Sequence, residues 1–313
     1  MVQNFQVSLQ LTFPIFMYLG LGIFLNVLGL VRTSIVGIIS KSVYWFFIPL
    51  LLFLNIYTSD LTQAFNAHIL LIGLGFLALI VLISSILLMR LPIDSNQKAI
   101  YIQAVYRSNI TLFTLPILGL FYSNDALASM SLFVVFLVPF FNLIAVIAFK
   151  RYSESSLNPI HILFEILKNP LIVASILGLV LNKLGIQLPL NLLHELSTLK
   201  EFSNPIALVS VGLMLNLTQF KKNQKQLIIL SAFRLVIIPA CALGFSIVFS
   251  LNSIETVGLI LAFAAPSPSV VAQMADHYHS DVDLATQLIM STVILSSLTL
   301  PLWITLFLQL HLI

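Results

Sequence analysis

The sequence predicts an all-α polytopic membrane protein with ten transmembrane helices, built as two inverted five-helix repeats. Three observations lead to this prediction. First, 59% of the 313 residues are hydrophobic and only 8% are charged, with a mean hydropathy of +1.08, whereas a soluble domain carries about 25% charged residues. Second, apolar stretches of about 20 residues follow one another along the chain. Third, two of these stretches, one in each half, are interrupted by polar residues and proline.

The apolar stretches divide the chain into about ten spans, at about 20 residues each with short loops between them. In the first half we expect spans at about 8–30, 36–57, 68–90, 99–121 and 127–149. In the second half we expect them at about 163–184, 195–217, 227–250, 255–276 and 284–309. The first stretch is too long for the core of a signal peptide and follows no basic residue, so we interpret it as a retained span.

Lysine and arginine gather on one side of this arrangement. The loops after the first, third, fifth and seventh spans, with the adjoining span ends, hold Arg32, Lys41, Arg90, Lys98, Lys150, Arg151, Lys168, Lys221, Lys222 and Lys225. Only Lys183 and Lys200 fall on the other side. The positive-inside rule makes the basic side cytoplasmic. We therefore expect a multi-pass protein of the cytoplasmic (plasma) membrane with both termini outside.

A polar segment from Lys150 to Asn158 separates two halves of five spans each. We predict a first repeat at 1–149, a cytoplasmic linker at 150–160 and a second repeat at 161–313. Because five is an odd number, the second half would enter the membrane upside down relative to the first. Prolines at corresponding places, and a broken fourth span in each half, favour such an inverted repeat.

The middle of the fourth span is unusually polar for a membrane helix. Ser108, Asn109 and Thr111 lie where lipid favours apolar side chains, and Pro116 lacks a backbone N–H. The ninth span is interrupted at the corresponding place by Ala-Ala-Pro-Ser-Pro-Ser, starting at residue 264. This second interruption offers Pro266, Ser267, Pro268 and Gln273.

Paired interruptions of this kind indicate the binding site of a transporter. In hydrocarbon a broken helix is tolerated only where the freed backbone faces protein or a water-filled cavity. Where half-helices meet, their N-termini carry partial positive charge, which suits a carboxylate. We therefore predict that the polar and proline residues of both breaks form a substrate-binding site. The alternative, that these side chains only satisfy kinked backbone, stays open.

Two arginines, Arg107 and Arg234, lie nearest to the interior of the bilayer. An ionisable residue inside a membrane is functional by default, and a cation near the breaks would attract anions. Both residues also lie about one turn inside the cytoplasmic end, from which a long side chain can reach water. We weigh the two explanations equally for Arg234 and favour the reach to water for Arg107.

No acidic residue lies in the middle of a predicted span, so the sequence contains no obvious carboxylate relay for protons. Coupling to H⁺ or Na⁺ stays open, and no cofactor is predicted. The segment from Asp276 to Asp283 contains histidines and aspartates, but its position between two spans favours a solvated loop over a metal site. The basic residues form no patch that would predict nucleic-acid binding.

At these residues the sequence resembles the auxin efflux carrier family, which includes plant auxin exporters and bacterial malate and malonate permeases. Asn109, seven residues before Pro116, is similar to the family's span-four crossover motif, although Thr114 replaces its usual glycine. Ala-Ala-Pro-Ser267 is similar to the span-nine crossover. The resemblance covers nearly the whole chain and includes later landmarks such as Phe-Arg-Leu-Val-Ile-Ile-Pro239.

The resemblance implies a fold similar to that of bile-acid symporters and sodium/proton antiporters. Spans one, two, six and seven would form a scaffold, and spans three to five and eight to ten a moving transport unit. Organic anions would bind where the broken spans cross, with Asn109 on the carboxylate and Pro116, Pro266 and Ser267 beside it.

We therefore predict a secondary active transporter of small organic anions, mono- or dicarboxylates such as malate, with an elevator-like form of alternating access. The compact central loop favours a bacterial-type permease over an auxin-like or aromatic acid exporter, and a facilitative carrier is a further alternative. A membrane-embedded enzyme is disfavoured because the sequence contains no His-Glu-x-x-His motif or paired carboxylates. A sensor is also disfavoured. A homodimer through the scaffold helices is compatible with the sequence.

Overall fold

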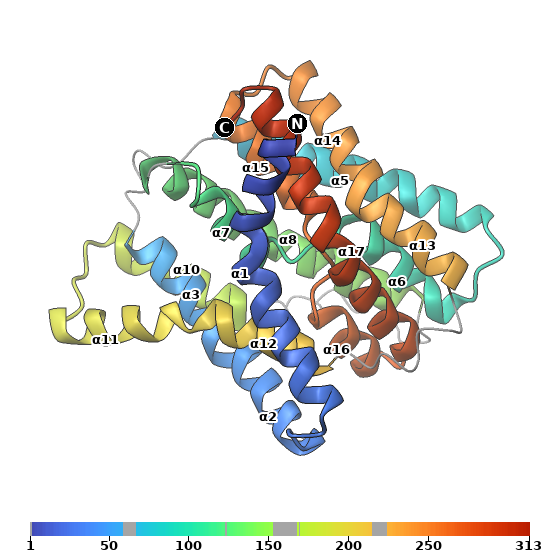
Figure 1. The fold of residues 1–313 in the computed structure, drawn as a ribbon, viewed down its shortest axis with the longest axis horizontal. Helices are drawn as coiled ribbons and strands as arrows, with labels where there is room; N and C mark the ends of the chain where they lie inside the picture. Colours follow the sequence, from blue (N-terminus) through green and yellow to red (C-terminus); the bar gives the residue numbers. More distant parts are fainter. Residues whose placement is uncertain (1, 59–66, 123, 153–167, 169, 215–223) are drawn as a thin grey trace.

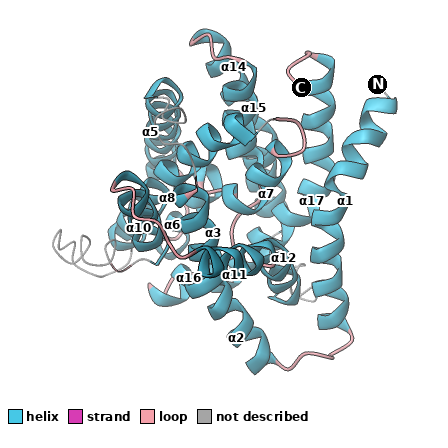
Figure 2. Ribbon diagram, turned by 90° about the vertical axis from the view of Figure 1, so that its left-hand side faces the viewer, coloured by secondary structure: helices cyan, strands magenta, loops and turns pink. Residues whose placement is uncertain are grey.

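The structure, a computed structural model, describes residues 2–58, 67–122, 124–152, 168, 170–214 and 224–313. Within these residues the regular structure consists of helices, with no strand. The two chain ends lie at the same end of the molecule (Figures 1 and 2).

The first half of the chain forms a series of long and short helices. They are α1 (Val2–Val27), α2 (Thr33–Ser42), the π-helix η1 (Val43–Phe47), α3 (Ile48–Tyr57), α5 (Ala67–Arg90), α6 (Ser95–Tyr106), α7 (Ile110–Leu118) and α8 (Asn124–Tyr152).

The second half continues in the same way. Its helices are α10 (Pro170–Lys183), α11 (Leu190–Glu201), α12 (Ser203–Met214), α13 (Gln224–Ala232), the π-helix η3 (Phe233–Ile237), α14 (Ile238–Val248), α15 (Ser253–Ala264), α16 (Val270–His277) and α17 (Val282–Gln309).

Five helical runs in the described residues are long and apolar enough to cross a membrane. They are Thr33–Tyr57, Ala67–Arg90, Leu132–Tyr152, Gln224–Val248 and Val282–Gln309. These runs coincide with the second, third, fifth, eighth and tenth predicted spans, so the prediction of an all-helical membrane protein is confirmed. The predicted fourth and ninth spans are each divided into two short helices, as their polar interruptions suggested.

Two predicted boundaries are wrong. The seventh span was expected at about 195–217, but helix α11 ends at Glu201 and α12 starts separately at Ser203. None of the residues of α11 is buried, and its mixed charged and leucine sequence is that of an amphipathic helix. Helix α8 continues past the predicted end at 149, so Lys150 and Arg151 form its last turn. The rest of the predicted linker, 153–160, lies outside the described residues.

The π-turns η1 and η3 each stand directly before an Ile-Pro pair, which contains Pro49 or Pro239. Proline lacks an N–H, and its ring crowds the carbonyl four residues earlier. A wider turn relieves this crowding, and such turns are frequent at functional sites. For Pro239 the carbonyl is that of Leu235, which accepts a 2.9 Å hydrogen bond from the indole N–H of Trp303. The two π-turns carry Tyr44 and Arg234, which are described below.

Helices α1 and α12 pack with their backbones in direct contact (Figure 1). A Cβ on Gly22 would lie 2.2 Å from the carbonyl oxygen of Val209, and one on Gly212 would lie 2.2 Å from that of Leu19. Without a hydrophobic driving force in lipid, small residues of this kind let helices approach closely. The two glycines therefore determine how α1 sits on α12.

The substitution Gly22→Ala should destabilise the protein, because the new methyl group forces α1 and α12 apart. Overpacking of this kind typically costs about 1–3 kcal/mol in the free energy of unfolding. Gly20→Ala is the matched control, because a Cβ there meets no atom within 4 Å. The melting temperature of the purified protein in detergent measures both variants. Equal melting temperatures would contradict the close contact.

Candidate functional site

The first break lies at Arg107–Asn109, between α6 and α7. Arg107 has an extended backbone, with φ −84° and ψ 104°, and helix resumes at Ile110. We expected Pro116 to contribute to the break, but Pro116 lies inside α7. A proline removes only one hydrogen bond from its own helix, and membrane helices tolerate this. The extended residues, by contrast, are held by bonds to the second broken helix.

The second break lies at 265–269, between α15 and α16. Pro266 and Pro268 cannot donate the backbone hydrogen bonds that would continue α15. For Pro266 the carbonyl left free is that of Ala262, which accepts a hydrogen bond from the Ser108 hydroxyl. The side chain of Thr114 donates to the carbonyl of Leu261 at 2.9 Å.

The backbone also crosses between the two breaks, because the N–H of Asn109 donates to the carbonyl of Pro266 at 2.8 Å. Buried backbone groups need partners, and each broken helix supplies them to the other. The hydroxyls of Ser108 and Thr114 thus satisfy broken backbone, which is the alternative that the sequence left open for them.

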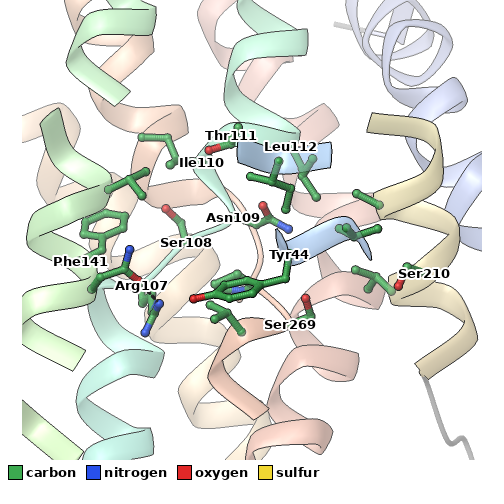
Figure 3. Close-up of a pocket in the computed structure, with 18 of the residues that line it drawn as sticks. Tyr44, Arg107, Ser108, Asn109, Ile110, Thr111, Leu112, Phe141, Ser210 and Ser269 are labelled. Carbon is green, nitrogen blue, oxygen red and sulfur yellow. Dashed lines mark hydrogen bonds between the residues drawn. The ribbon is translucent and has the colours of Figure 1, made fainter. Parts of the chain in front are cut away.

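A cavity of about 70 Å³ lies where the broken helices cross (Figure 3). Its polar lining comprises Ser40, Tyr44, Arg107, Ser108, Asn109, Thr111, Asn142, Ser210 and Ser269, and Pro268 adds an apolar face. Asn109 and Ser269 are the N-cap residues of α7 and α16, so both half-helices begin at the cavity. Neither side chain caps its own helix. The partial positive charge of both N-termini therefore faces the cavity.

Arg107 is the charged residue of this cavity. We expected its side chain to reach water, but only 2% of Arg107 is exposed, so that expectation is wrong. Its Nη1 donates to Gln103 Oε1 at 2.8 Å and to the sulfur of Met274 at 2.9 Å, and its Nη2 donates to Asn142 Oδ1. Extended backbone at the break turns the side chain sideways into the protein, away from the membrane surface (Figure 3).

No carboxylate in the described part of the chain pairs with Arg107, and the charge-bearing partners above are all neutral. A guanidinium has five N–H donors, so some remain after these three bonds. A buried cation without a counter-ion is unfavourable. The cavity is thus positively charged and suited to an anion.

Asn142, on α8, belongs to the cavity and was missed by the sequence analysis. It is 4% exposed, and its Nδ2 has no hydrogen-bond partner among the described residues. An amide in the apolar run Val-Pro-Phe-Phe-Asn-Leu-Ile-Ala is itself a signal, because polar side chains inside membranes are rare. Tyr44, which lies between Arg107 and Ser269 in Figure 3, carries no such signal, because a tyrosine near a span end suggests interfacial anchoring.

The other predicted site residues lie away from this cavity. Arg234 is completely buried and donates to backbone carbonyls. The N–H of Ser267 donates to Thr292 Oγ1 at 3.1 Å, and its buried hydroxyl has no partner within the described residues. Pro266 contributes the carbonyl that accepts from Asn109. The side chain of Gln273, in α16, lies outside the described part of the structure.

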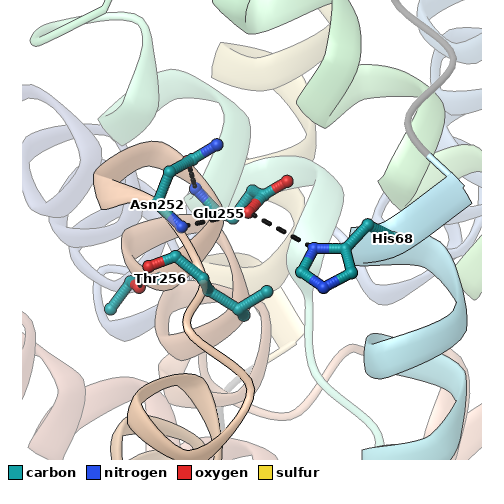
Figure 4. A network of polar contacts seen from close by, with 5 residues as sticks. His68, Asn252, Glu255 and Thr256 are labelled. Atoms are coloured by element: carbon teal, nitrogen blue, oxygen red, sulfur yellow. Dashed lines mark hydrogen bonds and ion pairs between the residues drawn. The ribbon is translucent and has the colours of Figure 1, made fainter.

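The start of α15 is held by a separate polar network at the far end from the break (Figure 4). Asn252 and Glu255 form a reciprocal capping box, with bonds of 3.0 and 3.1 Å. Glu255 also lies 3.8 Å from Nδ1 of His68, at the start of α5. The capping box satisfies two of the free N–H groups of the first turn, so both ends of α15 are fixed to neighbouring elements.

Comparison with known proteins agrees with this architecture. A family model described as "Membrane transport protein" matches residues 7–304. An uncharacterized transporter of Methanothermobacter thermautotrophicus is 31% identical over 135 residues, which is 43% of this chain and 44% of the relative. One of Methanocaldococcus jannaschii is 28% identical over 145 residues, 45% of this chain and 47% of the relative.

The matches to these two curated relatives therefore span about half of each relative's length. The family model, by contrast, covers nearly the whole of this chain. The chain belongs to this family of membrane transport proteins, the auxin efflux carrier family that its crossover motifs resemble.

Proposed function

We propose that this protein is a secondary transporter of small organic anions, mono- or dicarboxylates such as malate, and that they bind in the cavity at Arg107. The observation that carries the proposal is a buried guanidinium, lining a cavity, without a carboxylate partner among the described residues. An anion would supply the missing counter-charge.

The surroundings of Arg107 support a carboxylate in particular. Planar guanidinium and carboxylate groups match in a two-bond geometry. The half-helix N-termini at Asn109 and Ser269 add partial positive charge. The Nδ2 donor of Asn142 adds a neutral hydrogen bond. A cavity of about 70 Å³ is small, since sites for drug-sized ligands measure about 300–1,000 Å³. Small acids are therefore favoured over aromatic acids of the auxin type.

We further propose ten spans in two inverted repeats, which move by an elevator-like alternating access. In this proposal α1–α3 and α10–α12 form the scaffold, and α5–α8 with α13–α17 form the moving unit. Contacts between α1 and α12, and between α3 and α10, support the first group. The cavity lining supports the division, because Tyr44 and Ser210 come from the first group and Arg107 and Asn142 from the second.

The proposed orientation has both termini outside the plasma membrane. Termini at the same end of the molecule agree with an even number of spans (Figure 1). The proposal also includes a homodimer through the scaffold helices, whose outer faces expose large apolar side chains such as Phe13, Phe24 and Trp45. Lipid contact alone would also account for these side chains.

Arg107→Gln should reduce carboxylate transport by about a hundredfold or more, because loss of a buried charged partner costs about 2–5 kcal/mol. The measurement is counterflow: proteoliposomes loaded with unlabelled malate are diluted, and entry of labelled malate is followed. Arg151→Gln, an exposed arginine at the end of α8, is the matched control and should transport like the wild type. Wild-type counterflow in Arg107→Gln would contradict the site.

Asn109→Leu should abolish counterflow and leave the folded protein in the membrane. The substitution removes an amide from the cavity, whereas the backbone N–H of Asn109, which holds the crossing together, is kept. Size-exclusion elution and the melting temperature in detergent check the fold. An active variant with wild-type affinity would exclude a role for this side chain in binding.

Asn142→Asp should weaken substrate binding more than Asn142→Leu does. The new carboxylate would lie where Oδ1 now accepts from Arg107, and it would neutralise the guanidinium as an internal counter-ion. We expect KM to rise about tenfold or more, which corresponds to about 1.4 kcal/mol. KM for malate in proteoliposomes is the measurement. An unchanged KM in Asn142→Asp would show that the charge of Arg107 does not bind substrate.

A further inference from the structure

Arg234 is a second buried cation at the crossing, and its bonds differ from those of Arg107. It lies in the π-turn η3 and has 0% exposure. Its Nε and Nη2 both donate to the carbonyl of Ala265, at 3.1 and 3.0 Å, and its Nη1 donates to the carbonyl of Val105 at 3.0 Å. The guanidinium therefore spans from one broken helix to the other.

The two carbonyls belong to the C-terminal ends of the first half-helices. Val105 lies in the last turn of α6, and Ala265 is the C-cap residue of α15. The last carbonyls of a helix lack partners within the helix and carry partial negative charge. In transporters with broken helices such ends coordinate the coupling cation. Arg234 occupies the corresponding place here.

The charge of Arg234 is balanced by these carbonyls alone. In the described residues no carboxylate lies within ion-pair distance of Arg234, and each of its printed hydrogen bonds ends on a main-chain oxygen. Arginine keeps its charge, and its planar fork reaches two acceptors at once. A lysine ammonium offers no such fork.

We propose that Arg234 is a built-in cation, a positioning residue that takes the place of a coupling metal ion at the C-terminal ends of α6 and α15. It holds the two helix ends together from one side, and the N-terminal ends of α7 and α16 face the substrate anion on the other. Anion transport then needs no bound sodium ion. This inference about coupling rests on the proposed transport function, but the role of Arg234 as a cation does not.

The test is chemical rescue with guanidinium ion. Arg234→Ala removes the cation and leaves space for a small replacement, and Arg234→Met removes the charge but fills the space. Melting temperatures of the purified variants are measured with millimolar guanidinium chloride, sodium chloride or tetramethylammonium chloride. We expect guanidinium to raise the melting temperature of Arg234→Ala and to leave Arg234→Met, the control Arg151→Ala and the wild type unchanged.

Arg234→Lys, which keeps the charge, covers the case in which Arg234→Ala does not fold. We expect its melting temperature to lie below that of the wild type, because an ammonium cannot bond both carbonyls in the same way, and above that of Arg234→Met. Stability equal to that of Arg234→Met, or a guanidinium effect that is the same in Arg234→Ala and Arg151→Ala, would overturn the role of Arg234 as a cation.

Coupling is tested by counterflow at constant ionic strength, with sodium replaced by choline. We expect wild-type transport to be unchanged and guanidinium to restore part of the counterflow of Arg234→Ala. Transport by the wild type that requires sodium would overturn the coupling inference. If no carboxylate is transported, the proposed function fails, and the melting experiment still decides whether Arg234 acts as the built-in cation.

Discussion

The structure depends on the need to satisfy backbone carbonyls where proline has broken a helix away from water. In the bilayer interior no solvent can take the place of the missing N–H groups. Each broken helix therefore supplies donors to the other: the Ser108 and Thr114 hydroxyls and the Asn109 N–H bond to carbonyls at the end of α15 and beyond it. The two breaks form one structure, and neither would be stable without the other.

The crossing also separates charge. The C-terminal ends of α6 and α15 meet at Arg234, and the N-terminal ends of α7 and α16 meet at the cavity with Arg107. One arginine has its bonds completed by the protein, whereas the other keeps unused donors beside a cavity. The same residue type thus has two roles, and the difference follows from which helix ends surround it.

The sequence predicted the membrane class, the order of the long helices and both interruptions, because these depend on hydropathy and on proline, which act locally. It did not locate the first break correctly, because tertiary bonds from residues 107–109 to α15 decide that position rather than Pro116. It assigned Arg107 to the membrane surface, because distance along a helix says nothing of the sideways turn that extended backbone introduces. Tyr44 entered the cavity through tertiary packing, and no local pattern could have shown this.

The polar bonds at the crossing also indicate which parts can move together. Arg107, Arg234, Ser108 and Thr114 bond only within α6–α8 and α13–α17, by the bonds described above. The hydroxyls of Ser40 and Ser210, which also line the cavity, bond to each other at 3.0 Å and join α2 to α12. The cavity therefore lies between two sets of residues whose named bonds stay within each set. A displacement of one set along the other would keep the crossing, both arginines and a bound anion together, because it would break none of these bonds.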